Sequence, residues 1–500
     1  MKNVLEWLES AAMRTPQKIA VADGENELTY FELSSRARRL GSALCLHGQR
    51  NRPACVLLPR SADALAAMLG VVYSGNFYVV LDCEMPDERM RAIVERLRPF
   101  AIVTNEEYAP VAERLLPGGV IDAPASFAQT EDPTALAAVR RSMTDADPLY
   151  TLFTSGSTGT PKGVVIRHRN VISYIAWFTQ TFGIDETSVF GGQTPLYFSM
   201  SVSDVYGSLC AGATLELIPK SCFSFPALLV DFLNERKVDT IYWVPSALSL
   251  VANWGIFECK RPLYLRRVLF AGETMPTRQL NYWRSFFPHA LYANLFGPTE
   301  TTDICAYYVL DRDFADDEPL PIGRACDNCA LLVLGEDGRP VKPGEEGELW
   351  VRGSFVAPGY YCEPGKTAER FVQNPLHSDY PDPVYRTGDI VRENERGELV
   401  YVSRRDGQVK RMGYRIELGE IEAAASALPT LENCAALYDA DKKQIVLAYC
   451  ARGCSESELR EALKKHLPGY MLPERLVRFA ALPLSSNGKT DRAALLKSLA

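Results

Sequence analysis

Apolar runs of strand length alternate with helix-like segments along the first part of the chain. Residues 56–58 and 78–82 are typical of buried strands, and residues 63–73 between them are typical of a helix. Residues 28–40 show the polar start and apolar spacing of a capped amphipathic helix. A strand, a helix and a further strand form the unit from which parallel sheets are built, so the pattern predicts an α/β fold.

Strand-like runs recur further along the chain, at 150–153, 164–166, 239–241 and 268–271. A chain of 500 residues is too long for one compact core, and two or three domains are expected. The apolar content of 47% and the charged content of 23% are ordinary for a globular protein.

Targeting and membrane signals are not found in the sequence. The first eight residues lack the apolar core of a signal peptide. No uninterrupted apolar run approaches the roughly 18 residues that span a bilayer. The sequence therefore predicts a cytoplasmic protein that does not enter a membrane.

The charge distribution narrows the choice of partners. The net charge of −8 argues against a nucleic-acid partner. Residues 404–500 contain 16 Lys and Arg against 12 Asp and Glu, whereas residues 1–403 contain 38 against 50. A basic tail on an acidic body suits an anionic partner such as coenzyme A or an acidic carrier protein, although chance explains the asymmetry equally well.

Cysteine and histidine give no metal-site pattern. The thirteen cysteines are scattered, as expected for small apolar residues in a reducing compartment. Cys326 and Cys329 form one C-x-x-C without a second pair at zinc spacing, and the five histidines are dispersed.

A run rich in glycines and hydroxyls lies between the strand-like segments 150–153 and 164–166. Successive backbone N–H groups around glycines can point into one concavity and bind an anion. The hydroxyls in residues 154–158 add donors and Lys162 adds a positive charge, so a polyphosphate is the fitting ligand. The spacing differs from the P-loop motif. A flexible surface hairpin is the alternative, and the flanking strands argue against it.

This loop resembles the phosphate loop of the adenylate-forming enzymes, which include acyl-CoA ligases, luciferases and nonribosomal peptide adenylation domains. Similar motifs follow in order over roughly residues 10–495. The resemblance implies an α/β body, residues 1–403, with two parallel α/β sheets and a small β-barrel. It also implies a small mobile α+β domain, residues 404–500, hinged near Asp406.

The resemblance implies an ATP site with assigned roles. The loop would bind the phosphates through Thr154, Ser155, Gly156, Ser157, Thr158, Gly159 and Lys162. Adenine would lie beside a glycine turn and an aromatic ring, at Gly272, Glu273, Asn294, Phe296 and Gly297. The ribose would bind Asp389, with Arg404 nearby.

The catalytic candidates are Thr299, Glu300 and Lys489. A carboxylate near a triphosphate is repelled unless a divalent cation lies between them, so Glu300 is predicted to bind Mg²⁺. A solvated loop carboxylate is the alternative. By resemblance, Thr299 lies near the α-phosphate. Lys489, on an Asn-Gly turn, matches the family's catalytic lysine, which stabilises developing negative charge.

The acid pocket departs from the family pattern. Amino-acid-activating members carry Phe-Asp-x-Ser, whose aspartate holds the α-ammonium. Here Phe198 and Ser201 match, but Ser199 replaces the aspartate, and Asp204 is not expected to substitute for it. The predicted pocket residues are Phe198, Ser199, Met200, Ser203, Tyr242, Leu269, Ala271, Leu295 and Asp303.

Asp303 occupies a position that the family usually fills with an uncharged residue. Because a buried ammonium needs a partner, we hypothesise that the pocket's negative charge has moved to Asp303. The substrate would then be a carboxylic acid whose amine, if present, is displaced from the α carbon, as in a β- or ω-amino acid. The alternative is that Asp303 only binds loop backbone.

The acceptor of the acyl group is inferred from the residues that make up the later motifs. Residues 415–422 and 487–489 resemble peptide synthetases and D-alanyl-carrier-protein ligase more than fatty acyl-CoA ligases. We therefore expect a ligase that loads a separate carrier protein, because no Leu-Gly-Gly-x-Ser run follows Arg492. An acyl- or aryl-CoA ligase and a non-catalytic nucleotide-binding protein remain the alternatives.

Overall fold

The computed structural model describes residues 1–24, 26–155, 161–405, 408–426, 428, 430–440, 442–451, 453, 455–483, 490 and 492–499. The chain divides into two compact units. Unit 1 comprises residues 1–83, 97–152 and 163–405, and unit 2 comprises residues 84–96, 153–162 and 406–500.

A seven-stranded, largely parallel sheet has the strand order β18-β8-β7-β4-β3-β5-β6. Its strands are β3 (Pro53–Leu57), β4 (Phe77–Val80), β5 (Ala101–Thr104), β6 (Val120–Asp122), β7 (Pro148–Thr154), β8 (Lys162–Arg167) and β18 (Gly359–Tyr360). The neighbouring helices are α1 (Leu5–Arg14), α2 (Tyr30–Cys45), α3 (Ala62–Tyr73), α5 (Ala109–Leu115), α6 (Ala123–Phe127) and α7 (Pro133–Ser142).

The elements predicted in this region are confirmed. Helix α2 begins after Thr29, whose side chain accepts from the Glu32 N–H while the Glu32 carboxylate accepts from the Thr29 N–H. Helix α3 is almost entirely buried, because both of its faces pack in the core. Strand β3 is buried along its whole length, as its unbroken apolar sequence predicts.

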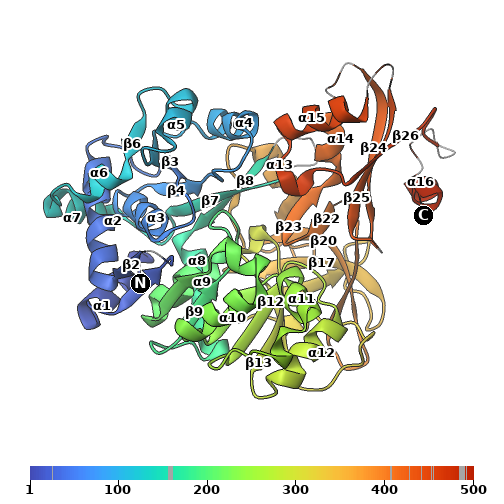
Figure 1. Cartoon of the computed structure of the whole chain (residues 1–500), viewed down its shortest axis with the longest axis horizontal. Coiled ribbons are helices and arrows are strands. Elements are labelled where there is room, and N and C mark those ends of the chain that lie inside the picture. Colours follow the sequence, from blue (N-terminus) through green and yellow to red (C-terminus); the bar gives the residue numbers. More distant parts are fainter. Residues whose placement is uncertain are drawn as a thin grey trace. The chain divides into compact units, whose positions relative to one another are not determined.

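A nine-stranded sheet has the order β15-β14-β13-β12-β11-β9-β10-β1-β2, and it is parallel from β13 to β1. Its strands are β1 (Ile19–Ala22), β2 (Glu27–Thr29), β9 (Val189–Gly192), β10 (Thr214–Leu217), β11 (Thr240–Trp243), β12 (Arg267–Ala271), β13 (Leu291–Phe296), β14 (Ala306–Val309) and β15 (Arg324–Ala325). Helices α8 (His168–Phe182), α9 (Ser201–Ala211), α10 (Pro226–Glu235), α11 (Pro245–Trp254) and α12 (Thr277–Phe286) lie around these strands (Figure 1).

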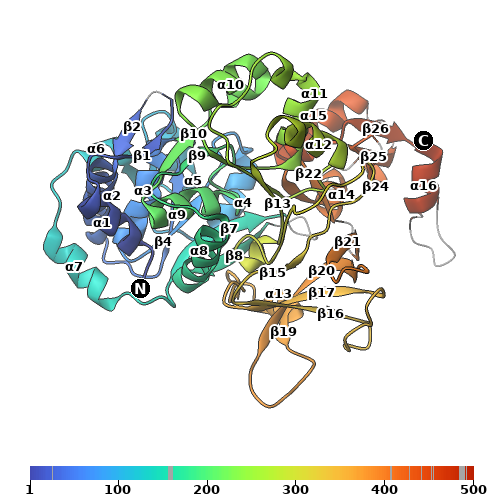
Figure 2. The same ribbon diagram turned by 90° about the horizontal axis from the view of Figure 1, so that it is seen from below.

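The strands expected to form a small barrel form a five-stranded antiparallel sheet, drawn in orange tones in Figure 2. Its strands are β16 (Cys329–Leu334), β17 (Glu346–Gly353), β19 (Phe371–Gln373), β20 (Pro383–Glu393) and β21 (Leu399–Arg404), and helix α13 (Pro364–Arg370) precedes β19. A core cluster that includes Leu349, Val351 and Val391 of this sheet also contains Phe296 from the end of β13.

Unit 2 combines a β-hairpin with a three-stranded sheet and its helices. Its elements are α4 (Asp87–Leu97), β22 (Gln408–Arg411), β23 (Tyr414–Glu417), α14 (Leu418–Ser426), β24 (Leu431–Asp439), β25 (Gln444–Ala451), α15 (Glu456–His466), β26 (Arg475–Arg478) and α16 (Arg492–Leu499). Arg89 of α4 and Glu420 of α14 form an ion pair that is almost wholly buried. None of the helices in the described part of the chain is long and apolar enough to cross a membrane.

Candidate active site

Strands β7 and β8 hold the two ends of the glycine-rich loop. The Thr154 hydroxyl donates to the Lys162 carbonyl at 3.5 Å, which closes the base of the loop. The Lys162 side chain is buried, and the Ser155 hydroxyl donates to the Arg415 carbonyl at 2.7 Å within unit 2. Gly156, Ser157, Thr158 and Gly159 lie outside the described residues, so their phosphate-binding role stays a prediction.

The carboxyl ends of β11, β12 and β13 bring several predicted pocket residues together. These strands are parallel neighbours, and in such sheets ligands bind beyond the carboxyl ends. The residues that lie there and are buried are Tyr242, Leu269, Ala271, Asn294, Leu295 and Phe296. The apolar ones also belong to core clusters, so the fold alone accounts for their burial.

The predicted adenine residues already have protein partners. The Asn294 amide donates to the Pro321 carbonyl at 2.8 Å, and the Phe296 ring lies 6.1 Å from the Tyr401 ring. The Glu273 carboxylate accepts from the Ser246 N–H at 2.9 Å. Gly272 has a φ of 93°, a conformation that a residue with a side chain rarely adopts, so the turn after β12 depends on this glycine.

Glu300 lies on a short 3₁₀ turn, Thr299–Thr301, directly after β13. Its side chain is fully buried, its Oε1 accepts from the Tyr360 hydroxyl at 2.8 Å, and its carbonyl accepts from the Ala357 N–H at 2.9 Å. The alternative of a solvated loop carboxylate is therefore wrong. Gly297 permits the sharp return of this loop, because an added Cβ would stand 2.3 Å from the Asp303 carbonyl oxygen.

Asp303 is the centre of a buried cluster of hydroxyl groups. Its Oδ2 accepts from the hydroxyls of Tyr174 at 3.0 Å, Tyr242 at 3.0 Å and Ser203 at 3.2 Å. Burial raises the pKa of this carboxyl to about 6, although hydrogen bonds from Tyr242, Ser199 and the other hydroxyls act to lower the pKa. The alternative that Asp303 binds only loop backbone is therefore wrong.

Backbone strain precedes this cluster. Thr302 is buried and has a φ of 70°, which is unusual for a β-branched residue and costs about 1–3 kcal/mol. Its hydroxyl donates to the Phe355 carbonyl at 2.7 Å, which holds the turn in place. The turn sets the direction in which Asp303 leaves the loop.

A second buried carboxylate lies within electrostatic reach of Asp303. Asp204 of α9 is buried, and its Oδ1 has no hydrogen-bond partner among the described residues. Burial raises the pKa of Asp204 well above its usual value, and the charge of Asp303 raises the pKa further, while Arg60 opposes the shift. Asp204, Arg60 and Tyr174 were not expected to take part, because nothing in a sequence shows which helix faces meet.

The remaining predicted pocket residues lie at the start of α9. Phe198 and Ser199 are partly buried, Met200 is buried, and Ser203 contacts Asp303 directly. Ser199 also contributes a hydrogen bond to the Asp303 carboxyl. The serine that replaces the expected aspartate is thus a neighbour of the Asp303 carboxyl.

Asp389 and Arg404 form an ion pair inside the antiparallel sheet. They are register partners on β20 and β21, the Nη1–Oδ1 distance is 2.8 Å, and the side chains are only 2% and 6% exposed. Arg404 also donates to the Thr387 carbonyl at 3.1 Å. Asp389 and Arg404 are predicted to bind the ribose and a phosphate of ATP. They would have to make those contacts while they remain paired with each other.

Two further predicted residues cannot be placed, in addition to the four of the glycine-rich loop. Lys489 and Asp406 lie outside the described residues, and their catalytic and hinge roles stay predictions. Within the part of the chain that the structure describes, no three His, Cys, Asp or Glu side chains gather into a metal site.

Two matches with known families cover most of the chain. Residues 8–361 match the AMP-binding enzyme family, and residues 420–489 match the AMP-binding enzyme C-terminal domain. The chain therefore belongs to the AMP-binding enzyme family, and it is an AMP-forming ligase.

Individual relatives share about a third of the sequence. The chain is 32% identical to an L-proline–[L-prolyl-carrier protein] ligase of Pseudomonas fluorescens, with full coverage of both chains. It is 30% identical to tyrocidine synthase 3 of Brevibacillus parabrevis over 99% of this chain, which spans only 8% of that protein. A solved structure of holo-PA1221, an NRPS protein containing adenylation and PCP domains, superposes with a TM-score of 0.84 at 25% identity, covering 99% of this chain and 84% of that one.

Proposed function

We propose that this protein uses ATP to convert an amino acid into its acyl-adenylate and then transfers the acyl group to the phosphopantetheine thiol of a separate carrier protein. The end-to-end match with a proline–carrier protein ligase supports the reaction type. The buried carboxylate cluster at Asp303 supports an amino acid as the acid that is activated.

In the first half-reaction, a carboxylate oxygen of the substrate attacks the α-phosphorus of ATP. The bond between the α-phosphorus and its bridging oxygen breaks, and pyrophosphate leaves. Little covalent chemistry falls to the protein in such reactions, so the rate comes from positioning and charge stabilisation. Lys162 and the loop around it would bind the phosphates, Thr299 would lie near the α-phosphate, and Lys489 would stabilise the charge that develops there.

The residues present fit a magnesium ion. Mg²⁺ is usually bound by one or two protein carboxylates together with substrate phosphates, and Glu300 is a buried carboxylate on the loop after β13. When bound, the ion would supply charge neutralisation for the triphosphate. The Tyr360 hydroxyl holds the Glu300 carboxylate and the Ala357 N–H holds its backbone carbonyl, and these contacts would orient Glu300 for that role.

In the second half-reaction, a thiol attacks the acyl carbon, the bond to the phosphate oxygen breaks, and AMP leaves. We propose that residues 404–500 move between the two half-reactions about Asp406. Rotations of this kind belong to the hinge class of domain motion.

The proposed substrate class follows from the charges around the acid pocket. Asp303 and Asp204 are both buried, and Arg60 is the cation that opposes the pKa shift of Asp204. Among the described residues, hydroxyl groups hold the Asp303 carboxylate, and a substrate ammonium nearby would compensate its charge. Since Ser199 stands where the α-ammonium partner is expected, the amine would lie further from the carboxyl carbon, as in a β- or ω-amino acid.

The test is an ATP–pyrophosphate exchange panel that contains α-amino, β-amino, ω-amino, aryl and fatty acids. Exchange with a β- or ω-amino acid is expected, and a clear preference for an ordinary α-amino acid would refute the substrate class. A second assay offers coenzyme A or holo carrier protein to the preferred acid and ATP. Faster thioester formation with coenzyme A would make the protein an acyl- or aryl-CoA ligase instead.

Lys489→Ala separates the half-reactions. Adenylation should fall by about a thousandfold, in line with the loss of one charge-stabilising donor, while thioester transfer from supplied acyl-adenylate should persist. Lys497→Ala, which removes an exposed lysine from the same unit, is the control. Equal loss of both half-reactions would count against the role assigned to Lys489.

A further inference from the structure

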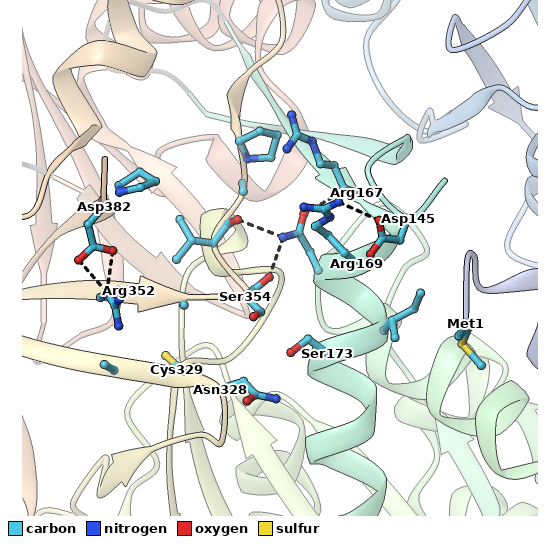
Figure 3. Close-up of a pocket in the computed structure, with 18 residues that line it drawn as sticks. Met1, Asp145, Arg167, Arg169, Ser173, Asn328, Cys329, Arg352, Ser354 and Asp382 are labelled. Carbon is cyan, nitrogen blue, oxygen red and sulfur yellow. Dashed lines mark hydrogen bonds and ion pairs between the residues drawn. The ribbon is translucent and has the colours of Figure 1, made fainter. Parts of the chain in front are cut away.

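Unit 1 contains a cavity of about 960 Å³ that the proposed reaction does not use. Figure 3 shows its lining, which comes from the end of β8 and the start of α8, the start of β16, the end of β17 with the loop after it, the start of β20 and Asp145 before β7. A cavity of this volume accommodates a ligand of drug size. Its charged lining residues are Asp145, Arg167, Arg169, Arg352 and Asp382.

The charges in the cavity do not cancel. Arg169 pairs with Asp145 at 2.8 Å, and the Arg352 Nε donates to both oxygens of Asp382 at 2.7 and 2.8 Å. Arg167, at the start of α8, forms no ion pair within the described part of the chain, so the lining carries one positive charge in excess. The positive end of the α8 dipole adds to this preference for an anion.

An unsatisfied hydroxyl lies on the same wall. The Ser173 Oγ is shielded from solvent and has no hydrogen-bond partner among the described residues, and Figure 3 shows it on the cavity side of α8. Buried hydroxyls normally have partners, and because this oxygen has almost no exposed surface, a ligand oxygen would reach it only after a small movement of the wall. Ile172, Val356 and Pro358 supply an apolar part of the lining.

Residues 354–357 separate this cavity from the loop that carries Glu300. On the cavity side, the Asn170 amide donates to the carbonyls of Ser354 at 2.7 Å and Val356 at 3.1 Å. On the other side, the Phe355 carbonyl accepts from Thr302, and the Ala357 N–H donates to the Glu300 carbonyl. Successive residues of one short segment therefore contact the cavity wall and the catalytic loop alternately.

A second connection runs through α8. Ser173 faces the cavity, while the next residue, Tyr174, donates its hydroxyl to Asp303 at 3.0 Å. The Tyr174 ring also packs edge-on against Phe355, with 5.5 Å between the ring centroids. A shift of α8 or of segment 354–357 would thus reach both buried carboxylates of the 300–303 loop.

We propose that this cavity binds a small organic anion, a carboxylate or phosphate monoester with an apolar body, and that its occupancy is coupled through residues 354–357 to the loop carrying Glu300 and Asp303. Arg167 binds the anionic group, Ser173 adds a hydrogen bond once the wall moves to expose its hydroxyl, and the apolar wall contacts the rest of the ligand. The binding step is independent of the proposed ligase function.

Binding is tested on the full chain with benzoate and phenyl phosphate as probes, by calorimetry and thermal shift at constant ionic strength. Saturable binding of at least one probe is expected, and the two probes distinguish a carboxylate site from a phosphate site. Arg167→Gln should weaken probe binding about tenfold, as the loss of one charge-assisted hydrogen bond does. Arg396→Gln, which removes an exposed arginine in the turn between β20 and β21, should leave probe binding unchanged.

Lys162→Ala distinguishes this cavity from the nucleotide site. Probe binding that survives Lys162→Ala and weakens in Arg167→Gln supports the proposal. Probe binding that is lost in Lys162→Ala and intact in Arg167→Gln, or no saturable binding of either probe, overturns it.

Coupling is tested by amide hydrogen exchange with mass spectrometry, which needs no enzymatic activity. The probe should slow exchange several-fold in peptides covering residues 299–305 of the wild type and leave them unchanged in Arg167→Gln. Slower exchange confined to peptides that line the cavity would overturn the coupling. The result does not depend on which acid the enzyme activates, so failure here and failure of the proposed function are distinguishable.

Discussion

Asp303 and Asp389 are both almost fully buried carboxylates, yet their surroundings differ in kind. Asp389 is paired with Arg404 at 2.8 Å, and Thr387 contributes further hydrogen bonds to the pair. Asp303 accepts hydrogen bonds from hydroxyl groups, and burial raises its pKa to about 6. One carboxylate is neutralised by the protein itself, and the other is held by donors that carry no compensating positive charge.

This difference separates a carboxylate whose charge the protein pairs from one whose charge is open to a ligand, while the ribose-binding role of Asp389 stays a prediction. A buried ion pair that is satisfied on both sides fixes the register of two strands, as Asp389 and Arg404 do on β20 and β21. A buried carboxylate without a cation is costly in the absence of a ligand, and an incoming ammonium relieves that cost. The contrast therefore supports the proposal that Asp303 selects the substrate.

The largest expected effect is on stability. Asp389→Asn leaves the Arg404 guanidinium buried without its anion, so the free energy of unfolding should fall by about 3–5 kcal/mol. Asp303→Asn removes a desolvated charge and keeps an acceptor oxygen, so the free energy of unfolding should fall by no more than about 1–2 kcal/mol. Urea denaturation of both variants measures the difference. Equal losses would mean that the two carboxylates have the same role.

The next effect is on pH dependence. Only the ionised form of Asp303 attracts an ammonium, and kcat/KM reports the pKa of groups in the free enzyme. Because this pKa is raised to about 6, kcat/KM for the preferred amino acid should fall with decreasing pH below about 6, approaching tenfold per pH unit, and level off above it. Pyrophosphate exchange from pH 5 to 8 checks this, and a flat wild-type profile would contradict it.

The smallest effect concerns a single hydroxyl. Tyr242→Phe removes one hydrogen bond that lowers the pKa of Asp303, so the inflection of the pH profile should move to higher pH. At neutral pH, substrate binding should weaken by about 1 kcal/mol, which raises KM roughly fivefold. Tyr264→Phe, which alters an exposed tyrosine, is the control. A shift of the inflection toward lower pH would show that this hydrogen bond does not lower the pKa of Asp303.

Much of the fold could be predicted from the sequence, because its signals are local. The capping pair of Thr29 and Glu32 and the apolar runs of β3 and β4 depend on neighbours in the chain. The antiparallel pairing around β20 was harder to predict, because the sequence of one strand does not show which distant strand pairs with it.

The candidate site could be predicted only in part. Glu300 and Asp303 stood out because their motif is contiguous, and the replacement at Ser199 was visible for the same reason. Tyr174 and Arg60 gave no signal, and Asp204 was set aside as a replacement for the missing aspartate, because these residues come from separate elements that meet only in the folded chain. The pairing of Asp389 with Arg404 likewise depends on strand register.

The most direct measurement of the central claim compares a β- or ω-amino acid with the same acid lacking its amine, in wild type and in Asp303→Asn. The wild type should prefer the amino acid by about a hundredfold in kcat/KM for pyrophosphate exchange, as expected for a buried charge pair. In Asp303→Asn the preference should fall toward unity. A variant that keeps the full wild-type preference would show that the ammonium is recognised elsewhere.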